Sequence, residues 1–212
     1  MPLKPSSKAW MQRHINDAYV QRAQRDGYRS RSAYKLLEIN ERDKLLLPGK
    51  IVVDLGAVPG GWAQVAGARV GPRGKVFAID LLPMEPLAHV SFRQGDFTDA
   101  DIQAHLKQDL PPGGVDLVIC DMAPNMSGIP SADQARIFNL AEEALEFAKQ
   151  VLKPDGAFLV KVFQGADFEA FRQALFATFH KVAPRKPKAS REESRELYLL
   201  GRGLKQNMAA EM

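Results

Sequence analysis

From residue 51 onwards, short apolar segments alternate with longer segments whose apolar residues recur at helical spacing. Strands are expected at 51–55, 75–79, 90–94, 115–120 and 157–163, with helices between or after them at 62–69, 99–107, 132–152 and 167–178. Repeated strand–helix units favour a mostly parallel sheet with right-handed crossovers. The segments 115–120 and 157–163 are almost continuously apolar, as is typical of central strands covered on both faces. The sequence therefore predicts an α/β, doubly wound, Rossmann-like sheet.

Helices and one further strand flank this alternating region. Before it, helices are expected over about 8–26 and from Ser32, as N-cap, to about residue 43. After it, the segment 195–201 (RELYLLG) reads as a last strand reached without a long helix, so it can join the sheet antiparallel. We expect three regions: a basic helical extension at 1–49, the sheet-containing domain at 50–205 and a C-terminal tail at 206–212.

Length and composition indicate an ordinary globular chain. Its 212 residues fit one domain, and no apolar run approaches the roughly 18 residues needed to span a bilayer. The single cysteine, Cys120, cannot form an intramolecular disulfide, and the four histidines have no metal-ligand spacing. Because the first ten residues lack the apolar core of a secretion signal, we expect a cytoplasmic location. We also expect no metal, no membrane contact and a monomeric state.

Charge is distributed unevenly along the chain. The net charge is only +4, but residues 1–50 contain eleven Lys and Arg against five Asp and Glu, and residues 181–205 contain eight against three. The rest of the chain is therefore net acidic. Two basic ends around an acidic centre suggest that the ends hold a polyanion such as RNA. The alternative is that basic ends only keep the chain soluble.

The carboxyl ends of the strands carry glycines and acids, and ligands bind at that edge of such sheets. The first strand runs into a turn over residues 54–62, which reads DLGAVPGGW. Glycines let the chain turn tightly and let a ligand approach the backbone. The turn is not a GxGxxG motif, so a dinucleotide pyrophosphate is not its expected occupant. A nucleoside cofactor and a plain strand–helix turn both remain open on this motif alone.

The next two strands end in carboxylates. Asp80 ends the second strand and can accept hydrogen bonds from both ribose hydroxyls of an adenosine. Asp96 and Phe97 follow the third strand and could offer a carboxylate to an exocyclic amine and a ring for stacking. Asp96 could equally be a helix N-cap. Together these positions favour an adenosine cofactor without phosphates, and S-adenosylmethionine fits that description.

A lysine interrupts the fifth strand, where both faces should be buried. Lys161 stands in the segment AFLVKVF, and removing an amine from water is unfavourable unless it is paired or neutral. It could instead extend to the surface from a strand end. Asp121 ends the fourth strand beside a proline-containing turn. Glu196 begins the last strand and would lie near Lys161 if that strand is antiparallel. Lys35 borders the apolar face of the second helix and, alone, would be an ordinary solvated lysine.

These residues fall in motifs that resemble the FtsJ-like family of RNA ribose 2′-O-methyltransferases. The matching motifs are RSRSAYKLLEI, DLGAVPGGWAQVA, GDF, DMAPNMSG, LVKVFQG and SRELYLLG, in the order of the family, and they span residues 25–203. The resemblance is strongest to bacterial members that methylate a uridine in the A loop of 23S ribosomal RNA in the large subunit. It implies a methyltransferase fold over 50–205, S-adenosylmethionine as cofactor and S-adenosylhomocysteine as product.

The resemblance also assigns site residues. The catalytic tetrad of the family falls on Lys35, Asp121, Lys161 and Glu196, with Lys161 as proton acceptor. Its cofactor contacts fall on Gly60, Trp62, Asp80, Asp96 and Asp121. One departure is visible, because the glycine motif reads AVPGG where the family is expected to have AAPGG, so that Val58 adds bulk to the turn.

The basic ends supply the expected RNA contacts. These are Arg13, Arg22, Arg25, Arg29 and Arg31 in the N-terminal segment, and Arg185, Lys186, Lys188 and Arg191 near the C-terminus. Two other functions are alternatives. A nucleobase N-methyltransferase would need an aromatic residue after Pro124, where this chain has Asn125, and would leave Lys161 without a role. An RNA-binding ribosome-assembly factor without catalytic activity would not need the two lysines and two acids of the catalytic tetrad.

Overall fold

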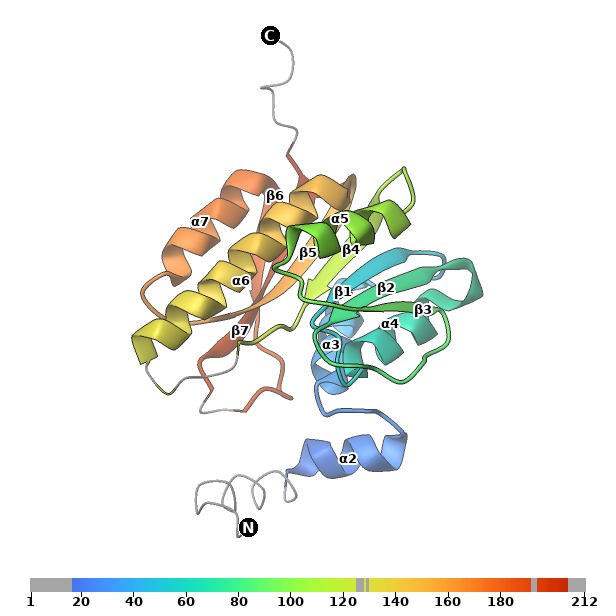
Figure 1. Cartoon of the computed structure of the whole chain (residues 1–212). Coiled ribbons are helices and arrows are strands. Elements are labelled where there is room, and N and C mark those ends of the chain that lie inside the picture. The colour runs from blue at the N-terminus through green and yellow to red at the C-terminus, as the bar shows by residue number, and fades with distance from the viewer. Residues whose placement is uncertain (1–16, 125–127, 129, 192–193, 206–212) are drawn as a thin grey trace.

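The computed structural model describes residues 17–124, 128, 130–191 and 194–205. A seven-stranded sheet runs through the molecule in the order β3-β2-β1-β4-β5-β7-β6 (Figure 1). The strands β1 to β5 pair in parallel, and β7 pairs antiparallel with β5 and β6. Their bounds are β1 Ile51–Leu55, β2 Lys75–Asp80, β3 Val90–Gln94, β4 Val115–Cys120, β5 Leu152–Phe163, β6 Phe179–Arg185 and β7 Glu196–Leu204. The predicted α/β, doubly wound sheet is confirmed.

Helices cover both faces of the sheet. In the view of Figure 1, α5, α6 and α7 lie in front of the strands, and α3 and α4 lie behind them. The helices are α2 Ala18–Asp26, α3 Ala33–Asp43, α4 Gly61–Val70, α5 Ala100–Asp109, α6 Pro130–Val151 and α7 Phe168–Thr178, and a short 3-10 helix, η1, spans Gly71–Arg73. The connections from β1 to β2, from β3 to β4 and from β4 to β5 each carry a helix to one face, as the alternating pattern predicts, whereas β2 and β3 are joined without a helix.

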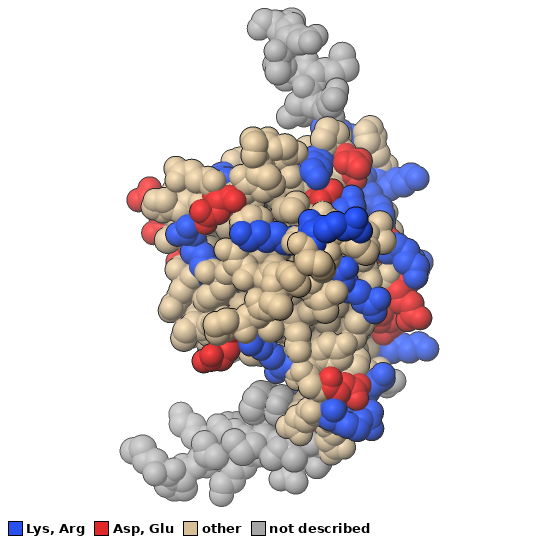
Figure 2. All heavy atoms as spheres, turned by 90° about the vertical axis from the view of Figure 1, so that its right-hand side faces the viewer, with Lys and Arg blue, Asp and Glu red and all other residues tan. Residues whose placement is uncertain are grey.

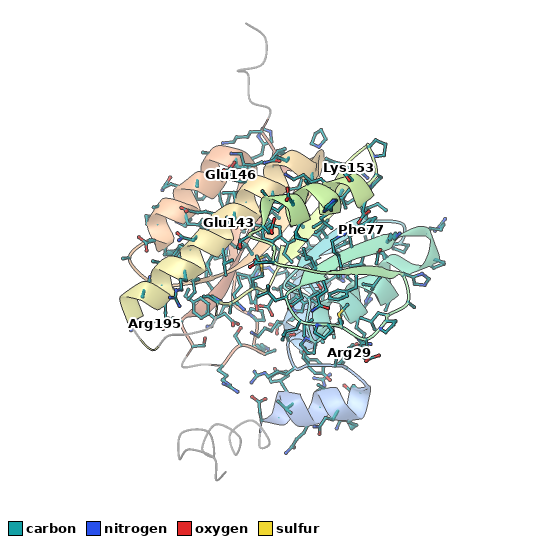
Figure 3. The ribbon with its side chains drawn as sticks, viewed as in Figure 1. Arg29, Phe77, Glu143, Glu146, Lys153 and Arg195 are labelled. Atoms are coloured by element: carbon teal, nitrogen blue, oxygen red, sulfur yellow. The ribbon has the colours of Figure 1, made fainter. Side chains whose placement is uncertain are left out.

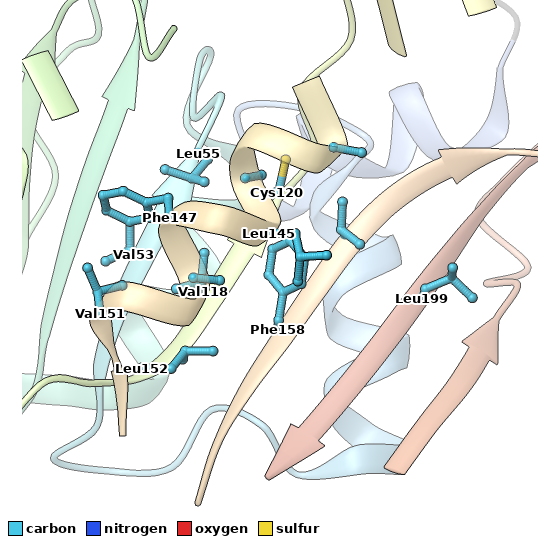
Figure 4. Packing of buried hydrophobic residues seen from close by; sticks show 14 of the residues in the cluster. Val53, Leu55, Val118, Cys120, Leu145, Phe147, Val151, Leu152, Phe158 and Leu199 are labelled. Carbon is cyan, nitrogen blue, oxygen red and sulfur yellow. The ribbon is translucent and has the colours of Figure 1, made fainter. Parts of the chain in front are cut away.

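The core consists of two main apolar layers. The larger layer lies between the sheet and α5–α7 and includes Phe147 of α6, Leu55 of β1 and Phe158 of β5 (Figure 4). The second layer joins α3 and α4 to the opposite face and contains Leu36 and Trp62. Because α3 packs on the same sheet face as α4, the helix that contains Lys35 is part of the hydrophobic core of the domain. The division of the chain after residue 49, into a basic extension and a sheet-containing domain, stays a prediction.

Two strands differ from the sequence-based expectation. β5 begins at Leu152 instead of 157, because the register of its pairing with β4 shifts between Val115 and Leu117 and allows the irregular start to pair. β6 was not predicted at all. It is an edge strand whose exposed polar positions and Pro184 mask the alternation of apolar residues that marks a strand.

The antiparallel last strand is confirmed. It runs beside β5, with Tyr198 opposite Lys161 and Glu196 opposite Phe163. The start of β7 therefore lies at the carboxyl end of β5, which is the arrangement that brings Glu196 to the ligand edge of the sheet.

The N-terminal helix is shorter than expected. α2 begins at Ala18, because Asp17 is extended and caps it by accepting hydrogen bonds from the amides of Tyr19 and Val20. The predicted start at residue 8 lies outside the described residues. Gly27 ends the helix in the left-handed conformation. α3 starts where expected, but the Ser32 hydroxyl bonds to that of Ser30 instead of capping the helix.

None of the helices in the described part of the chain is both long enough and apolar enough to cross a bilayer.

Candidate active site

A cavity of about 350 Å³ opens at the carboxyl ends of β1 to β4. This volume lies within the usual range of small-molecule sites. Its wall contains the acids at the carboxyl ends of β2, β3 and β4, namely Asp80, Asp96 and Asp121, together with Gly56 and Val58 of the turn after β1. The topology therefore brings to one cavity the strand-end residues that the sequence analysis selected.

Asp80 ties together the two loops beside the cavity. One carboxylate oxygen accepts a hydrogen bond from the amide of Val58 at 2.9 Å, and the other accepts one from the amide of Leu82 at 2.9 Å. Each carboxylate oxygen has a further lone pair, so these bonds leave acceptor capacity. The predicted contact of Asp80 to a ribose stays a prediction.

The loop after β3 presents Asp96 to solvent and buries its neighbour. An Asp96 oxygen accepts hydrogen bonds from the amide and the hydroxyl of Thr98, at 2.9 and 2.8 Å. The N-cap of α5 is Asp99, so the capping alternative for Asp96 is wrong. Phe97 is 4% exposed, and its ring packs edge-to-face on Phe147 at 5.4 Å between centroids. That ring is therefore engaged in the core, and its predicted stacking on a cofactor stays a prediction.

The glycines of the turn after β1 serve close packing. A Cβ on Gly56 would lie 2.4 Å from Cγ of Met122, which follows β4 at the cavity. A Cβ on Gly60 would lie 2.9 Å from the guanidinium of Arg29. Trp62 is 2% exposed, and its indole N–H donates to the carbonyl of Ser32. Among the described residues that line the cavity, neither Gly60 nor Trp62 occurs, so their cofactor contacts stay predictions.

Lys161 lies beside the cavity and is paired there. Its Nζ is 3.2 Å from an oxygen of the Asp121 carboxylate and donates to the Asp121 carbonyl at 2.5 Å. The side chain is 8% exposed, so the amine does not extend to solvent. Because Asp121 is itself part of the cavity wall, the amine lies next to whatever occupies the cavity.

A second lysine–acid pair completes the group. Nζ of Lys35 is 2.5 Å from Oε1 of Glu196, and each of the two side chains is 12% exposed. The structure therefore brings together the four residues Lys35, Asp121, Lys161 and Glu196, from α3, the end of β4, β5 and β7. The sequence spacing does not show that these four residues meet, because α3 and β7 lie near opposite ends of the chain.

Tyr198 links the two pairs and was not selected from the sequence. Its hydroxyl lies 2.9 Å from an Asp121 oxygen and 3.4 Å from Glu196 Oε1, and the Ser190 hydroxyl donates to the same Glu196 oxygen at 3.0 Å. The ring packs on Trp62, with centroids 5.5 Å apart. One signal was available: residues two apart on a strand share a face, so Tyr198 had to face the same side as Glu196.

The electrostatics of this group follow from burial and pairing. Burial raises the pKa of Glu196, but the charge and hydrogen bond of Lys35 outweigh it and hold that pKa below its usual value. Burial, Asp121 and Glu196 together raise the pKa of the Tyr198 phenol well above 10. Tyr198 therefore acts as a hydrogen-bond donor near neutral pH, while Glu196 is a carboxylate.

One further acid lies beneath the site. Asp54 of β1 is completely buried. Burial, and then the charges of Asp121 and Asp80, raise its pKa well above the usual value, which favours the neutral acid. No group of three His, Cys, Asp or Glu within the described residues is arranged to hold a metal ion.

Replacing Tyr198 with phenylalanine should slow catalysis more than it weakens cofactor binding. The variant keeps the ring but removes the donor that bridges Asp121 and Glu196. Loss of one hydrogen bond to a charged group costs about 1.5–3 kcal/mol, so kcat is expected to fall about tenfold or more. Single-turnover rates and cofactor affinity would be measured together. Unchanged kcat would show that the bridge does not orient the catalytic group.

Several predicted RNA contacts are engaged within the protein. Arg31 forms an ion pair with Asp17 and donates to the carbonyl of Ala189, and its side chain is 16% exposed. Arg185 bonds both oxygens of Asp43 at 2.6 Å. The Lys186 amine donates to the carbonyls of Ser194 and Glu196. Arg29 donates to three backbone carbonyls. Protein acceptors therefore orient these four side chains, and their predicted contacts to RNA stay predictions.

The other predicted RNA contacts are on the surface. Arg22 and Arg25 of α2 are 54% and 74% exposed, and Arg191 is 42% exposed. Lys188 is exposed on the loop that follows β6. Arg13 lies outside the described residues. Figure 2 shows that Lys and Arg side chains also spread over the side of the molecule formed by β3 and α4, so the basic surface is not restricted to the chain ends.

Comparisons with known proteins agree with this arrangement. Residues 28–204 match the family model described as FtsJ-like methyltransferase. A ribosomal RNA large subunit methyltransferase E from Dechloromonas aromatica is 59% identical over 200 residues, covering 94% of this chain and 98% of that protein. The protein of the same description from an Azoarcus species is 58% identical over 201 residues, covering 95% of this chain and 98% of its own.

A solved structure shares the fold. The crystal structure of a protein from Plasmodium falciparum, described as a ribosomal RNA methyltransferase, superposes with a TM-score of 0.75 at 29% identity. The match covers 84% of this chain and 98% of that one.

Proposed function

Because the chain belongs to the FtsJ-like methyltransferase family, we propose that it transfers the methyl group of S-adenosylmethionine to the ribose 2′-hydroxyl of a uridine in 23S ribosomal RNA. The observation that carries this proposal is the buried Lys161–Asp121 pair at the wall of the cavity. An amine held beside a carboxylate suits an acceptor that must lose a proton, as an alcohol does. The relatives' descriptions supply the ribosomal RNA.

The cavity fits the cofactor by its chemistry. Its polar side chains are the carboxylates Asp80, Asp96 and Asp121 and the hydroxyl of Thr98. The carboxylates accept hydrogen bonds from hydroxyl and amine groups and favour a cation over phosphates. We assign Asp80 to the ribose, Asp96 to the adenine amine and Asp121 to the methyl-transfer end. Val58 lines the cavity, so the position at which the chain departs from the expected alanine borders the cofactor site.

The reaction is a displacement at carbon. When bound, S-adenosylmethionine supplies a methyl group on a positively charged sulfur. The ribose 2′-oxygen would bond to this methyl carbon while the carbon–sulfur bond breaks with its electrons remaining on sulfur, which would release S-adenosylhomocysteine. The hydroxyl proton passes to Nζ of Lys161, which acts as the general base. Asp121 orients that amine, while Lys35 and Glu196 position the ribose.

The proposal is tested by locating the methyl group. The protein is incubated with labelled cofactor and large ribosomal subunits from cells that lack it, and the RNA is digested to nucleosides. We expect label in 2′-O-methyluridine and in no base-methylated nucleoside. Label on a base would replace the proposal with nucleobase methylation. Tight RNA binding without any transfer would favour an assembly factor. Naked 23S RNA in a parallel reaction shows whether assembly is required.

RNA binding should depend steeply on salt through the exposed basic residues. Each phosphate contact contributes about 0.7–0.9 to the slope of log affinity against log salt concentration. Replacing Arg25 with alanine is therefore expected to reduce the slope by up to about that amount and to weaken binding at low salt. Arg172, on α7 and paired with Glu169, provides the control substitution, for which the slope should not change. A slope unaltered by the Arg25 change would remove this residue from the interface.

The cytoplasmic location, the monomeric state and a reaction without metal remain predictions from the sequence.

A further inference from the structure

Arg29, labelled in Figure 3, contacts two loops that border the cavity. It follows α2 and precedes α3, in the segment expected from the sequence to contact RNA. Its guanidinium donates to the carbonyl of Pro59, in the turn after β1, at 3.5 Å. It also donates to the carbonyls of Glu85 and Pro86, in the loop after β2, at 2.7 and 2.9 Å. One side chain therefore joins two loops that are far apart in the sequence.

Both loops form part of the cavity. The turn after β1 contributes Val58, and the loop after β2 contributes Leu81. The two loops are also joined at Asp80, which bonds the amides of Val58 and Leu82 on the cavity side. Arg29 makes the second connection, farther along both loops. Together with the backbone bonds from Gly56 and Ala57 to the Ile79 carbonyl, these two side-chain connections set the separation of the loops, and so the shape of the cavity between them.

The residues around Arg29 leave space for its side chain. Gly60 has a φ of +105°, and a Cβ there would lie 2.9 Å from the Arg29 guanidinium and 3.0 Å from Sδ of Met84. The absence of a side chain at Gly60 therefore leaves the space through which Arg29 crosses from one loop to the other.

The backbone of the same segment is fixed to α4. The Arg29 amide donates to the Gln64 side chain at 3.0 Å, and the Gln64 amide group donates in turn to the carbonyl of Gly27 at 2.8 Å. A Cβ on Gly61 would lie 2.1 Å from the Ser30 hydroxyl, so the segment lies directly on the first turn of α4. Arg29 is thus held from its backbone to its guanidinium, unlike the exposed arginines of α2.

We propose that Arg29 is a positioning residue for the cofactor, which fixes the two loops that enclose it, and that it is not a phosphate contact. The inference rests on the proposed function, because it assumes that the cavity binds S-adenosylmethionine. Three of the five guanidinium donors are directed at carbonyl groups of the two loops, so these loops, and not a phosphate, orient the side chain. A lysine cannot replace the two guanidinium nitrogens that donate to these carbonyls, because its amine is a single point of charge.

The test measures cofactor binding without RNA. S-adenosylhomocysteine is titrated into the full chain and into Arg29→Ala and Arg29→Lys by calorimetry. Both variants are expected to bind it at least about tenfold more weakly, because the loops lose their second connection. Arg69→Ala is the matched control, since Arg69 is an exposed arginine in the last turn of α4, and its affinity should stay within about twofold of the wild type.

Two further readouts separate positioning from general loss of structure. In steady-state assays, KM for S-adenosylmethionine should rise about tenfold in Arg29→Lys, with kcat and KM for RNA within about threefold of the wild type. Amide hydrogen exchange over residues 82–88 should accelerate in both Arg29 variants and not in Arg69→Ala. If Arg29→Ala does not fold, Arg29→Lys alone is compared with the wild type and with Arg69→Ala.

Wild-type cofactor affinity in Arg29→Ala, with weaker RNA binding and a smaller salt slope, would overturn the inference and return Arg29 to the RNA interface. Full recovery of cofactor affinity in Arg29→Lys would also overturn it, because charge alone would then suffice. If the wild-type chain itself binds no S-adenosylhomocysteine, the proposed function fails. The exchange of residues 82–88 still tests the loop connection in that case.

Discussion

Replacing Lys161 with arginine is expected to slow methyl transfer by about 10²–10⁴-fold, the usual contribution of a general base. Arginine keeps the positive charge and can still pair with Asp121, but its guanidinium does not lose a proton in proteins. The variant therefore separates proton acceptance from positioning. Single-turnover methylation of large subunits measures the chemical step without product release.

The matched control is Lys153→Arg, the same substitution near the other end of β5, where the lysine pairs with Asp116. It should methylate at the wild-type rate. Lys161→Met removes the amine without adding bulk and should be as slow as the arginine variant, with cofactor binding retained. Near-normal turnover in Lys161→Arg would exclude general-base catalysis and leave Lys161 only a positioning role.

Replacing Arg185 with alanine is expected to destabilise the fold by about 2 kcal/mol, a value between those of exposed and fully buried ion pairs. The Arg185 guanidinium bonds both oxygens of Asp43, and the two side chains are 12% and 9% exposed. The pair joins the end of α3 to β6. Without Arg185, the Asp43 carboxylate stays largely buried, and Arg202, with a nitrogen 3.9 Å away, compensates only in part.

Urea unfolding at several pH values would measure this effect. Burial raises the pKa of Asp43, but the bonds and charge of Arg185 outweigh it and hold that pKa below its usual value of 3.8. A carboxylate with a lowered pKa stabilises the fold above about pH 4, and this contribution is lost as the pH falls further. The difference between wild type and variant should therefore be full at pH 7 and shrink below pH 4.

Two controls distinguish this role from RNA binding. Arg172→Ala removes an arginine from an exposed pair and should cost less than about 0.5 kcal/mol. The double variant Asp43→Asn with Arg185→Met should be less destabilised than Arg185→Met alone, since no unpaired charge remains. A stable Arg185→Ala protein with weakened RNA binding would contradict this prediction and support the contact expected from the sequence.

The sequence predicted the helices and strands best where the apolar residues follow a single clear pattern. The strand β4 matches its predicted bounds because its buried residues form one apolar run, and α6 was expected within two residues of its ends. The strand β6 was missed because an edge strand needs no continuous apolar pattern. The irregular start of β5 was missed because its Lys-Pro-Asp-Gly segment reads as a turn, while the neighbouring strand allows it to pair.

The sequence by itself determined the kind of site. It placed Asp80, Asp96 and Asp121 at strand ends, where topology makes them converge, and it marked Lys161 as an amine in a buried strand. These inferences needed only local patterns and the general rule for parallel sheets. The identity of the RNA came from resemblance alone.

Only the tertiary structure decided which polar side chains are available. Arginine in a basic segment has the same sequence signature whether it faces a phosphate or a carbonyl. Arg29 and Arg185 differ from Arg25 because their partners, in the loop after β2 and at the end of α3, are distant in the sequence. The hydroxyl of Tyr198 likewise became part of the site only when β7 paired with β5. Hydrogen bonds and burial depend on which distant segments meet, and packing of the whole chain sets this.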